Sequence, residues 1–130
     1  MIVVDASAIL EFLLGGARSG RVASRLFAAG ESLHAPHLLD LEVAQVLRRS
    51  FLSGYMTESR AGEALEDLSG MRIRRYPHFV LLPRIWELRH NISAYDAAYV
   101  ALAERLGGAL ATCDAALAAT RGHSAAIELL

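Results

Sequence analysis

Four acidic residues stand at positions where carboxylates can gather around one site. Asp5 and Asp114 follow short apolar stretches that are typical of buried strands, and Glu42 and Asp96 lie near the starts of strongly helical segments. In an open parallel α/β sheet, the carboxyl ends of the strands and the first turns of the next helices face one edge. A cluster of carboxylates without basic partners stays ionised only when cations neutralise it. The four acids therefore predict a divalent-metal site.

The elements that must position these acids alternate along the chain, which predicts an α/β fold. We expect a mostly parallel sheet of four or five strands, flanked by helices in a three-layer arrangement. The expected strands are 2–4, 32–35, 71–76, 109–112 and 125–129. The expected helices are 6–14, 18–29, 36–53, 57–70, 78–90, 94–106 and 114–121. Pro36 should be the first residue of the third helix. Pro83 leaves undecided whether the first turn of segment 78–90 is helical.

Three of the acids also have a purely structural interpretation as helix caps. Asp5 and Asp114 each precede a helical segment, where Asp is a good N-cap residue. Asp96 stands three residues after Ser93, the spacing of a capping box with Asp in place of the usual Glu. Capping and metal binding both remain open for these residues.

Glu42 has a different structural alternative, because it lies inside its helical segment. Gln45 and Arg49 follow it at helical spacing, so an ordinary surface pair with either residue accounts for it. The joint occurrence of the four acids favours the metal site, since each also stands near a small alanine that leaves room for ions and a phosphodiester.

Composition narrows the function classes. The chain has 130 residues, 54% of them hydrophobic and 21% charged, which predicts one ordered domain spanning 1–130. All 13 basic residues are arginines, so a P-loop with its lysine is excluded. The formal net charge is −1, and setting aside the four acids leaves +3, which suits a polyanionic substrate.

The remaining composition bears on the cellular setting. The single cysteine, Cys113, excludes an internal disulfide and fits a reducing cytoplasm, and we expect it to be a small buried residue. No signal peptide is visible at the start, and no apolar run approaches the roughly 18 residues of a membrane span. We therefore expect no membrane partner.

Three segments carry a resemblance to a known family. They are 3–8, 35–43, and the stretch from 88 through Tyr95-Asp96-Ala97-x-Tyr99 to Thr112-x-Asp114. The chain resembles the PIN-domain ribonucleases, most closely the VapC toxins of bacterial toxin–antitoxin pairs. The resemblance spans nearly the whole chain and says little about 55–85.

The resemblance implies a PIN-like fold and roles for particular residues. The metal-binding and catalytic acids are then Asp5, Glu42, Asp96 and Asp114, and the auxiliary hydroxyl residues are Ser7 and Thr112. Positions 115–117 hold Ala, Ala and Leu where some relatives carry a further acid or Asn. This departure implies one firmly held ion and a second recruited with the substrate.

The implied reaction is hydrolysis of RNA phosphodiester bonds by water activated on Mg²⁺ or Mn²⁺. Phosphate contacts set the affinity of such a protein for RNA, and the candidate RNA-binding residues are Arg48, Arg49, Arg74 and Arg75. Tyr95 and Tyr99 share one helix face, and we interpret them as core residues rather than as platforms for base stacking.

The resemblance also implies partners. A VapB-type antitoxin would cover the acidic pocket with an extended C-terminal segment, and the chain would form a homodimer in the cytoplasm. Helical regions 6–14 and 57–70 offer apolar surfaces for a dimer. Two alternatives stay open: a DNA-directed metal-dependent nuclease, and a degenerate PIN fold that serves only as a binding or scaffold module.

Overall fold

The computed structural model describes residues 1–130, and its centre is one five-stranded sheet in the order β3-β2-β1-β4-β5. Every neighbouring pair of strands is parallel. The strands are β1 (Ile2–Val4), β2 (Leu33–Pro36), β3 (Ile73–Tyr76), β4 (Ala109–Thr112) and β5 (Ile127–Leu129). The expected α/β architecture with a parallel sheet is confirmed.

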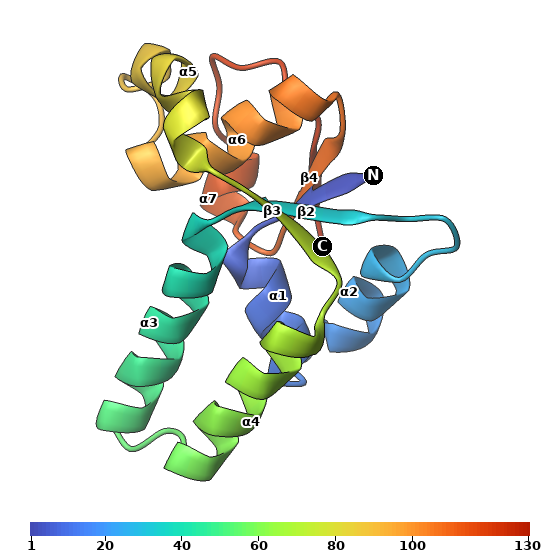
Figure 1. Ribbon diagram of the computed structural model, residues 1–130, viewed down its shortest axis with the longest axis vertical. Helices are drawn as coiled ribbons and strands as arrows, with labels where there is room; N and C mark the ends of the chain where they lie inside the picture. Colours follow the sequence, from blue (N-terminus) through green and yellow to red (C-terminus); the bar gives the residue numbers. More distant parts are fainter.

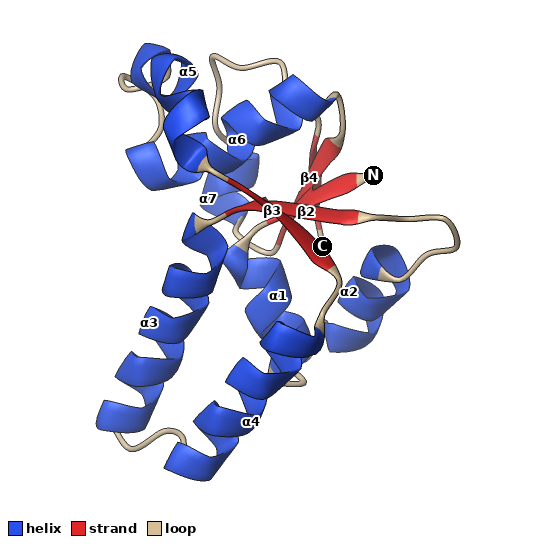
Figure 2. Cartoon of the chain, in the orientation of Figure 1, coloured by secondary structure: helices blue, strands red, loops and turns tan.

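Helices cover both faces of the sheet (Figure 1, Figure 2). One face carries α1 (Ala6–Leu13), α2 (Ser19–Leu26), α3 (Leu38–Leu52) and α4 (Glu58–Gly70). The other face carries the 3₁₀ helix η1 (His78–Leu81), α5 (Leu82–Glu87) and α6 (Ala94–Leu106). A short helix, α7 (Ala115–Ala118), follows β4. None of these helices combines the length and the apolar character needed to cross a bilayer.

The order of the strands creates a crevice at one end of the sheet. The chain places β2 and then β3 on one side of β1, and afterwards returns to place β4 on the other side of β1. Where the direction of winding reverses in an open α/β sheet, the carboxyl ends of the strands leave a ligand-binding crevice. Here that point lies between β1 and β4, next to Asp5 and Asp114.

Close packing against the sheet holds α6 in place. Its residues 97–103 are all buried, and the helix contacts β1, β2 and β4. Ala97, Ala98 and Ala101 carry small side chains, so the helix backbone can approach the sheet closely. Gly107 ends the helix with a positive φ of 67°, a conformation that favours glycine. The first turn of α6, which carries Asp96, therefore has a defined place at the crevice.

Several element boundaries differ from those expected. Pro36 closes β2 opposite Tyr76 instead of opening a helix, and the next residue, His37, donates its N–H to the Tyr76 carbonyl at 2.8 Å. Segment 78–90 is not one helix, because Pro83 fits only the first turn of α5, and the residues before it form η1. The expected helices 18–29 and 114–121 end earlier, at Leu26 and Ala118. The alanines that follow have a high helix propensity, which extended the prediction past the point where tertiary packing ends each helix.

A partly buried arginine contact fixes the turn that carries Asp114. The guanidinium of Arg18 donates to the carbonyl oxygens of Cys113, at 3.2 Å, and Leu130, at 3.0 Å. This ties the end of β4 to the end of the chain from the side of α2. Cys113 itself is a buried free thiol, as expected.

Candidate metal centre

All four acids line one cavity of about 530 Å³ at the crevice. Asp5 and Ser7 come from the junction of β1 and α1, and Glu42 comes from α3. Asp96 comes from α6, and Asp114 from the junction of β4 and α7. Four segments that are far apart in the sequence thus contribute one carboxylate each, at the edge where the parallel sheet was expected to place them.

Asp5 is the most enclosed of the four, with 5% of its surface exposed. Its carboxylate accepts hydrogen bonds from the Ala8 N–H at 3.0 Å, the Ser7 hydroxyl at 2.8 Å and the Thr112 hydroxyl at 2.7 Å. The cap interpretation is therefore correct for Asp5, and the same carboxylate also lines the cavity. Burial raises the pKa of Asp5, the three hydrogen bonds oppose that rise, and the charge of Asp114 adds to it.

Ser7 and Thr112 join the ends of β1 and β4. The Ser7 hydroxyl accepts the Cys113 N–H at 2.8 Å, and the Thr112 hydroxyl accepts the Asp114 N–H at 2.9 Å. The two hydroxyl oxygens lie 3.1 Å apart. Each hydroxyl thus receives a backbone N–H from one strand end and donates to Asp5 at the other, so the network holds the first and last acids in fixed relative positions.

Asp114 and Asp96 each stand at the start of a helix, but their cap bonds differ. Asp114 accepts the N–H groups of Ala116 at 2.7 Å and Leu117 at 3.3 Å, which confirms its cap role. The Asp96 N–H donates to the Ser93 hydroxyl at 3.2 Å, but no bond runs back from the Ser93 N–H to the Asp96 carboxylate. Only half of the capping box forms, so its geometry leaves the Asp96 carboxylate facing the cavity. Burial and the charge of Asp114 raise the pKa of Asp96.

Glu42 pairs with neither Gln45 nor Arg49. Its Oε2 accepts a hydrogen bond of 2.5 Å from the Tyr99 hydroxyl on α6. Burial raises the pKa of Glu42, the Tyr99 hydrogen bond lowers it, and the charges of Asp96 and Asp5 raise it further. Tyr99 is a core residue, as expected, but its contact with Glu42 was not predicted. The available signal was its spacing, since Tyr99 shares a helix face with Asp96 three residues earlier.

The charges around the cavity fit a cation. None of the four acids takes part in an ion pair, whereas Asp40, Glu31 and Glu104 all pair with arginines. The donors are all oxygens, which Mg²⁺ and Mn²⁺ prefer. No three His, Cys, Asp or Glu side chains stand close enough to enclose an ion as they are. Because like charges repel and Mg²⁺ keeps several waters, this open arrangement fits a hydrated ion.

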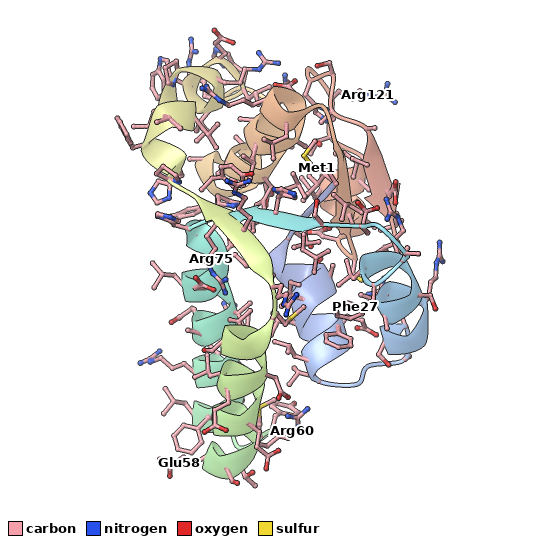
Figure 3. The ribbon with its side chains drawn as sticks, turned by 45° about the vertical axis from the view of Figure 1, so that its right-hand side comes forward. Met1, Phe27, Glu58, Arg60, Arg75 and Arg121 are labelled. Carbon is pink, nitrogen blue, oxygen red and sulfur yellow. The ribbon has the colours of Figure 1, made fainter.

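The four candidate arginines lie in different places. Arg49 lines the acid cavity, but Arg48 lines a separate groove between α3 and α4. Arg75 lies beside α3 (Figure 3) and makes a two-pronged ion pair with Asp40, at 2.7 and 2.9 Å. Arg74 lies over the ring of Tyr76. Only Arg49 of the four is placed to meet a substrate in the cavity.

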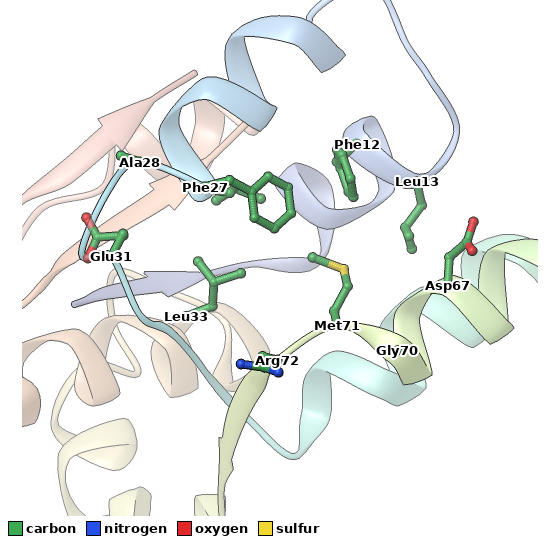
Figure 4. A pocket seen from close by; sticks show the side chains of 11 residues that line it. Phe12, Leu13, Phe27, Ala28, Glu31, Leu33, Asp67, Gly70, Met71 and Arg72 are labelled. Atoms are coloured by element: carbon green, nitrogen blue, oxygen red, sulfur yellow. The ribbon is translucent and has the colours of Figure 1, made fainter.

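The largest cavity of the molecule is a different one, of about 690 Å³ (Figure 4). It lies between α1, α2 and the end of α4, near the amino ends of β2 and β3, and its lining includes Phe12, Phe27, Leu33 and Met71. None of the four acids reaches it. Its mainly apolar lining makes it unsuitable for the chemistry considered above.

Comparisons with known proteins identify the family of this chain. The PIN domain family model matches residues 2–122. Ribonuclease VapC9 of Mycobacterium tuberculosis is 46% identical over 120 residues, covering 92% of this chain and 91% of the relative. The crystal structure of PAE2754 from Pyrobaculum aerophilum has a TM-score of 0.70 and 26% identity, covering 97% of this chain and 81% of that one.

A more distant structure shares the fold. VapBC2 from Rickettsia felis, solved with a DNA fragment from the promoter, has a TM-score of 0.70 at 14% identity and covers 99% of this chain and 98% of that one. At that identity the likeness shows the fold alone. The family match over residues 2–122, and the 46% identity to VapC9 over 92% of this chain, show more. This chain belongs to the PIN domain family and, within it, to the VapC ribonucleases.

Proposed function

We propose that this protein, as a single PIN domain over residues 1–130, is the endoribonuclease toxin of a VapBC pair and hydrolyses RNA with the help of Mg²⁺ or Mn²⁺. The observation that carries the proposal is the set of four acids without ion-pair partners, gathered in one cavity at the crevice between β1 and β4. Membership of the VapC ribonucleases supports RNA as the substrate.

The residues that would hold the cation are Asp5, Asp96 and Asp114, with Glu42 on α3 lining the same cavity. When bound, a divalent cation supplies an activated water for attack on the phosphodiester and neutralises charge in the transition state. The protein supplies the positions: the hydroxyls of Ser7 and Thr112 fix Asp5, and the turn held by Arg18 fixes Asp114. No side-chain nucleophile is required.

The test compares two single-stranded oligonucleotides of one sequence, one RNA and one DNA, incubated with the purified protein and Mn²⁺. We expect cleavage of the RNA alone, and none after EDTA removes the metal. Equal cleavage of the DNA would favour the DNA-directed alternative. If the protein binds no metal in calorimetry and cleaves neither the RNA nor the DNA, it is the scaffold module, and the proposal fails.

Arg49 is the side chain best placed to bind the RNA backbone. It is exposed, lies in no ion pair and lines the cavity next to Glu42 and Gln45. We expect Arg49→Ala to raise KM several-fold and to reduce the slope of log affinity against log salt by about 1. Arg48→Ala is the matched comparison, since it removes the same charge from the adjacent position on α3. Equal effects of both variants would show that the contact is not specific to the cavity.

The relatives support an antitoxin partner, since VapBC2 was solved as a VapB–VapC complex. We propose that a VapB-type antitoxin covers the acid cavity and blocks cleavage, in the cytoplasm where the free thiol of Cys113 stays reduced. Adding the product of a neighbouring antitoxin gene should stop RNA cleavage by the purified protein. Cleavage that continues in a stable complex would contradict this placement.

We also propose a homodimer, although its surface differs from the one expected. Regions 6–14 and 57–70 expose little apolar surface, with Leu65 the one large exposed apolar side chain among them. One group of exposed apolar side chains lies instead on η1, α5 and the start of α6: Phe79, Val80, Leu82, Trp86 and Tyr95. A patch of this kind marks an interaction surface. Sedimentation that finds only monomer at micromolar concentration would contradict the dimer.

A further inference from the structure

The hydroxyl of Tyr99 joins the two helices that carry Glu42 and Asp96. The Tyr99 side chain is 1% exposed and its ring belongs to the core. Its hydroxyl makes one hydrogen bond, of 2.5 Å, to Oε2 of Glu42, which lies 57 residues earlier in the chain. This is also the one side-chain hydrogen bond that Glu42 accepts, and its Oε1 has no protein partner. The bond therefore connects α6 to α3 at the cavity.

A buried tyrosine needs a partner for its hydroxyl, and a backbone carbonyl would serve equally well for stability. Here the partner is one of the four unpaired acids, and it lies on the wall of the cavity. A glutamate side chain has several rotatable bonds and loses its position readily when nothing holds it. A short hydrogen bond from a rigid, core-packed ring restricts it to one position.

The other acids are held in a similar way. Hydroxyls of Ser7 and Thr112 hold Asp5, and backbone N–H groups hold Asp114. In each case the donors are themselves fixed by the fold. Tyr99 supplies the corresponding donor for Glu42, the acid with the longest side chain of the four.

We propose that Tyr99 is a positioning residue for Glu42, holding Oε2 so that Oε1 faces the cavity and is available to the cation. The inference rests on the proposed function, because it assumes that Glu42 contributes to metal binding. It explains why a tyrosine rather than a phenylalanine occupies this buried site. Residues that orient metal ligands affect metal affinity or activity by about 10- to 100-fold when they are changed.

Tyr99→Phe tests the proposal, since it keeps the buried ring and removes only the hydroxyl. We expect the affinity for Mn²⁺, measured by calorimetry, to fall about tenfold, and kcat for RNA cleavage to fall about tenfold with KM unchanged. The matched control is Tyr76→Phe, which removes a hydroxyl bonded to His34 at 2.8 Å, away from the cavity. We expect the control to leave both quantities unchanged.

A double variant separates positioning from simple packing. If Tyr99 acts through Glu42, Tyr99→Phe has no further effect on Mn²⁺ affinity when Glu42 is already Gln. Additive losses in Tyr99→Phe/Glu42→Gln would overturn the proposal and leave Tyr99 a core residue. Normal affinity and kcat in Tyr99→Phe, with both impaired in Glu42→Gln, would overturn the positioning role alone. Normal values in Glu42→Gln would overturn the metal role of Glu42 and, with it, this inference.

Discussion

Asp5→Asn is expected to abolish RNA cleavage while the protein stays folded. We expect kcat/KM to fall at least about 10³-fold, which corresponds to about 4 kcal/mol of lost transition-state stabilisation. The physical reason is that asparagine keeps the shape of the side chain and its capping ability, but removes the charge that would hold the cation. Asp96→Asn should act in the same way, because its carboxylate is not used in a complete capping box.

The measurement is the rate of cleavage of a labelled RNA at saturating Mn²⁺, together with the circular dichroism spectrum and melting temperature of each variant. Asp40→Asn is the matched control, since Asp40 lies on α3 outside the cavity and pairs with Arg75. We expect it to cleave RNA at the wild-type rate. Full activity in purified, folded Asp5→Asn would remove this residue from the proposed metal set.

Metal and pH should together control the stability of the protein. Burial raises the pKa values of Asp5, Glu42 and Asp96 above their ordinary values, so ionising them costs the folded state free energy. Without metal, this penalty appears as the pH rises above the ordinary carboxylate values of 3.8 to 4.5, and it grows until the pH exceeds the raised pKa values of the folded protein. A bound divalent cation offsets the same charges.

Two measurements follow from this linkage. At pH 7 and free Mn²⁺ of about 100 times the dissociation constant, the melting temperature should rise by about 10 °C, from about 2.7 kcal/mol of binding free energy. Without metal, the melting temperature of Asp5→Asn minus that of the wild type should grow as the pH rises from about 4 to 7, because the variant has no charge to bury.

The quantity to follow is the difference in melting temperature between the variant and the wild type, because other carboxylates change the stability with pH in the opposite direction. Pairing with the N-terminus and Arg25 lowers the pKa of Glu31 to about 2, and pairing with Arg84 lowers that of Glu104 to about 2. These pairs stabilise the folded protein above their ordinary pKa of 4.5, and the stability is lost as the pH falls toward 2. They are shared by both proteins and cancel. A melting temperature that Mn²⁺ shifts equally in Asp5→Asn would contradict the metal site.

Much of the site follows from local rules. Asp5, Ser93 and Asp114 all cap helices at the positions expected, because a cap involves only residues within three positions along the chain. The meeting of the four acids in one cavity was also predictable, since the carboxyl ends of parallel strands share one edge whatever the side chains do.

Other contacts were beyond sequence reasoning. Tyr99 reaches Glu42 across 57 positions, and Arg75 reaches Asp40 across 35. Whether two such side chains meet depends on how each helix is rotated and seated on the sheet, and side chains from the whole core decide that rotation. The choice of Arg49 rather than Arg48 as the cavity residue has the same origin, since one residue along α3 turns a side chain by about 100°.

The amino-acid sequence by itself determined the succession of strands and helices along the chain, the helix caps, and the edge of the sheet at which the acids collect. These features depend on neighbouring residues and on the handedness of the chain. Only the tertiary structure decided that Asp5 is held by two hydroxyls, that Glu42 is held by Tyr99, and that one arginine faces the cavity. These contacts join segments far apart in the chain, and their geometry exists only once the core has packed.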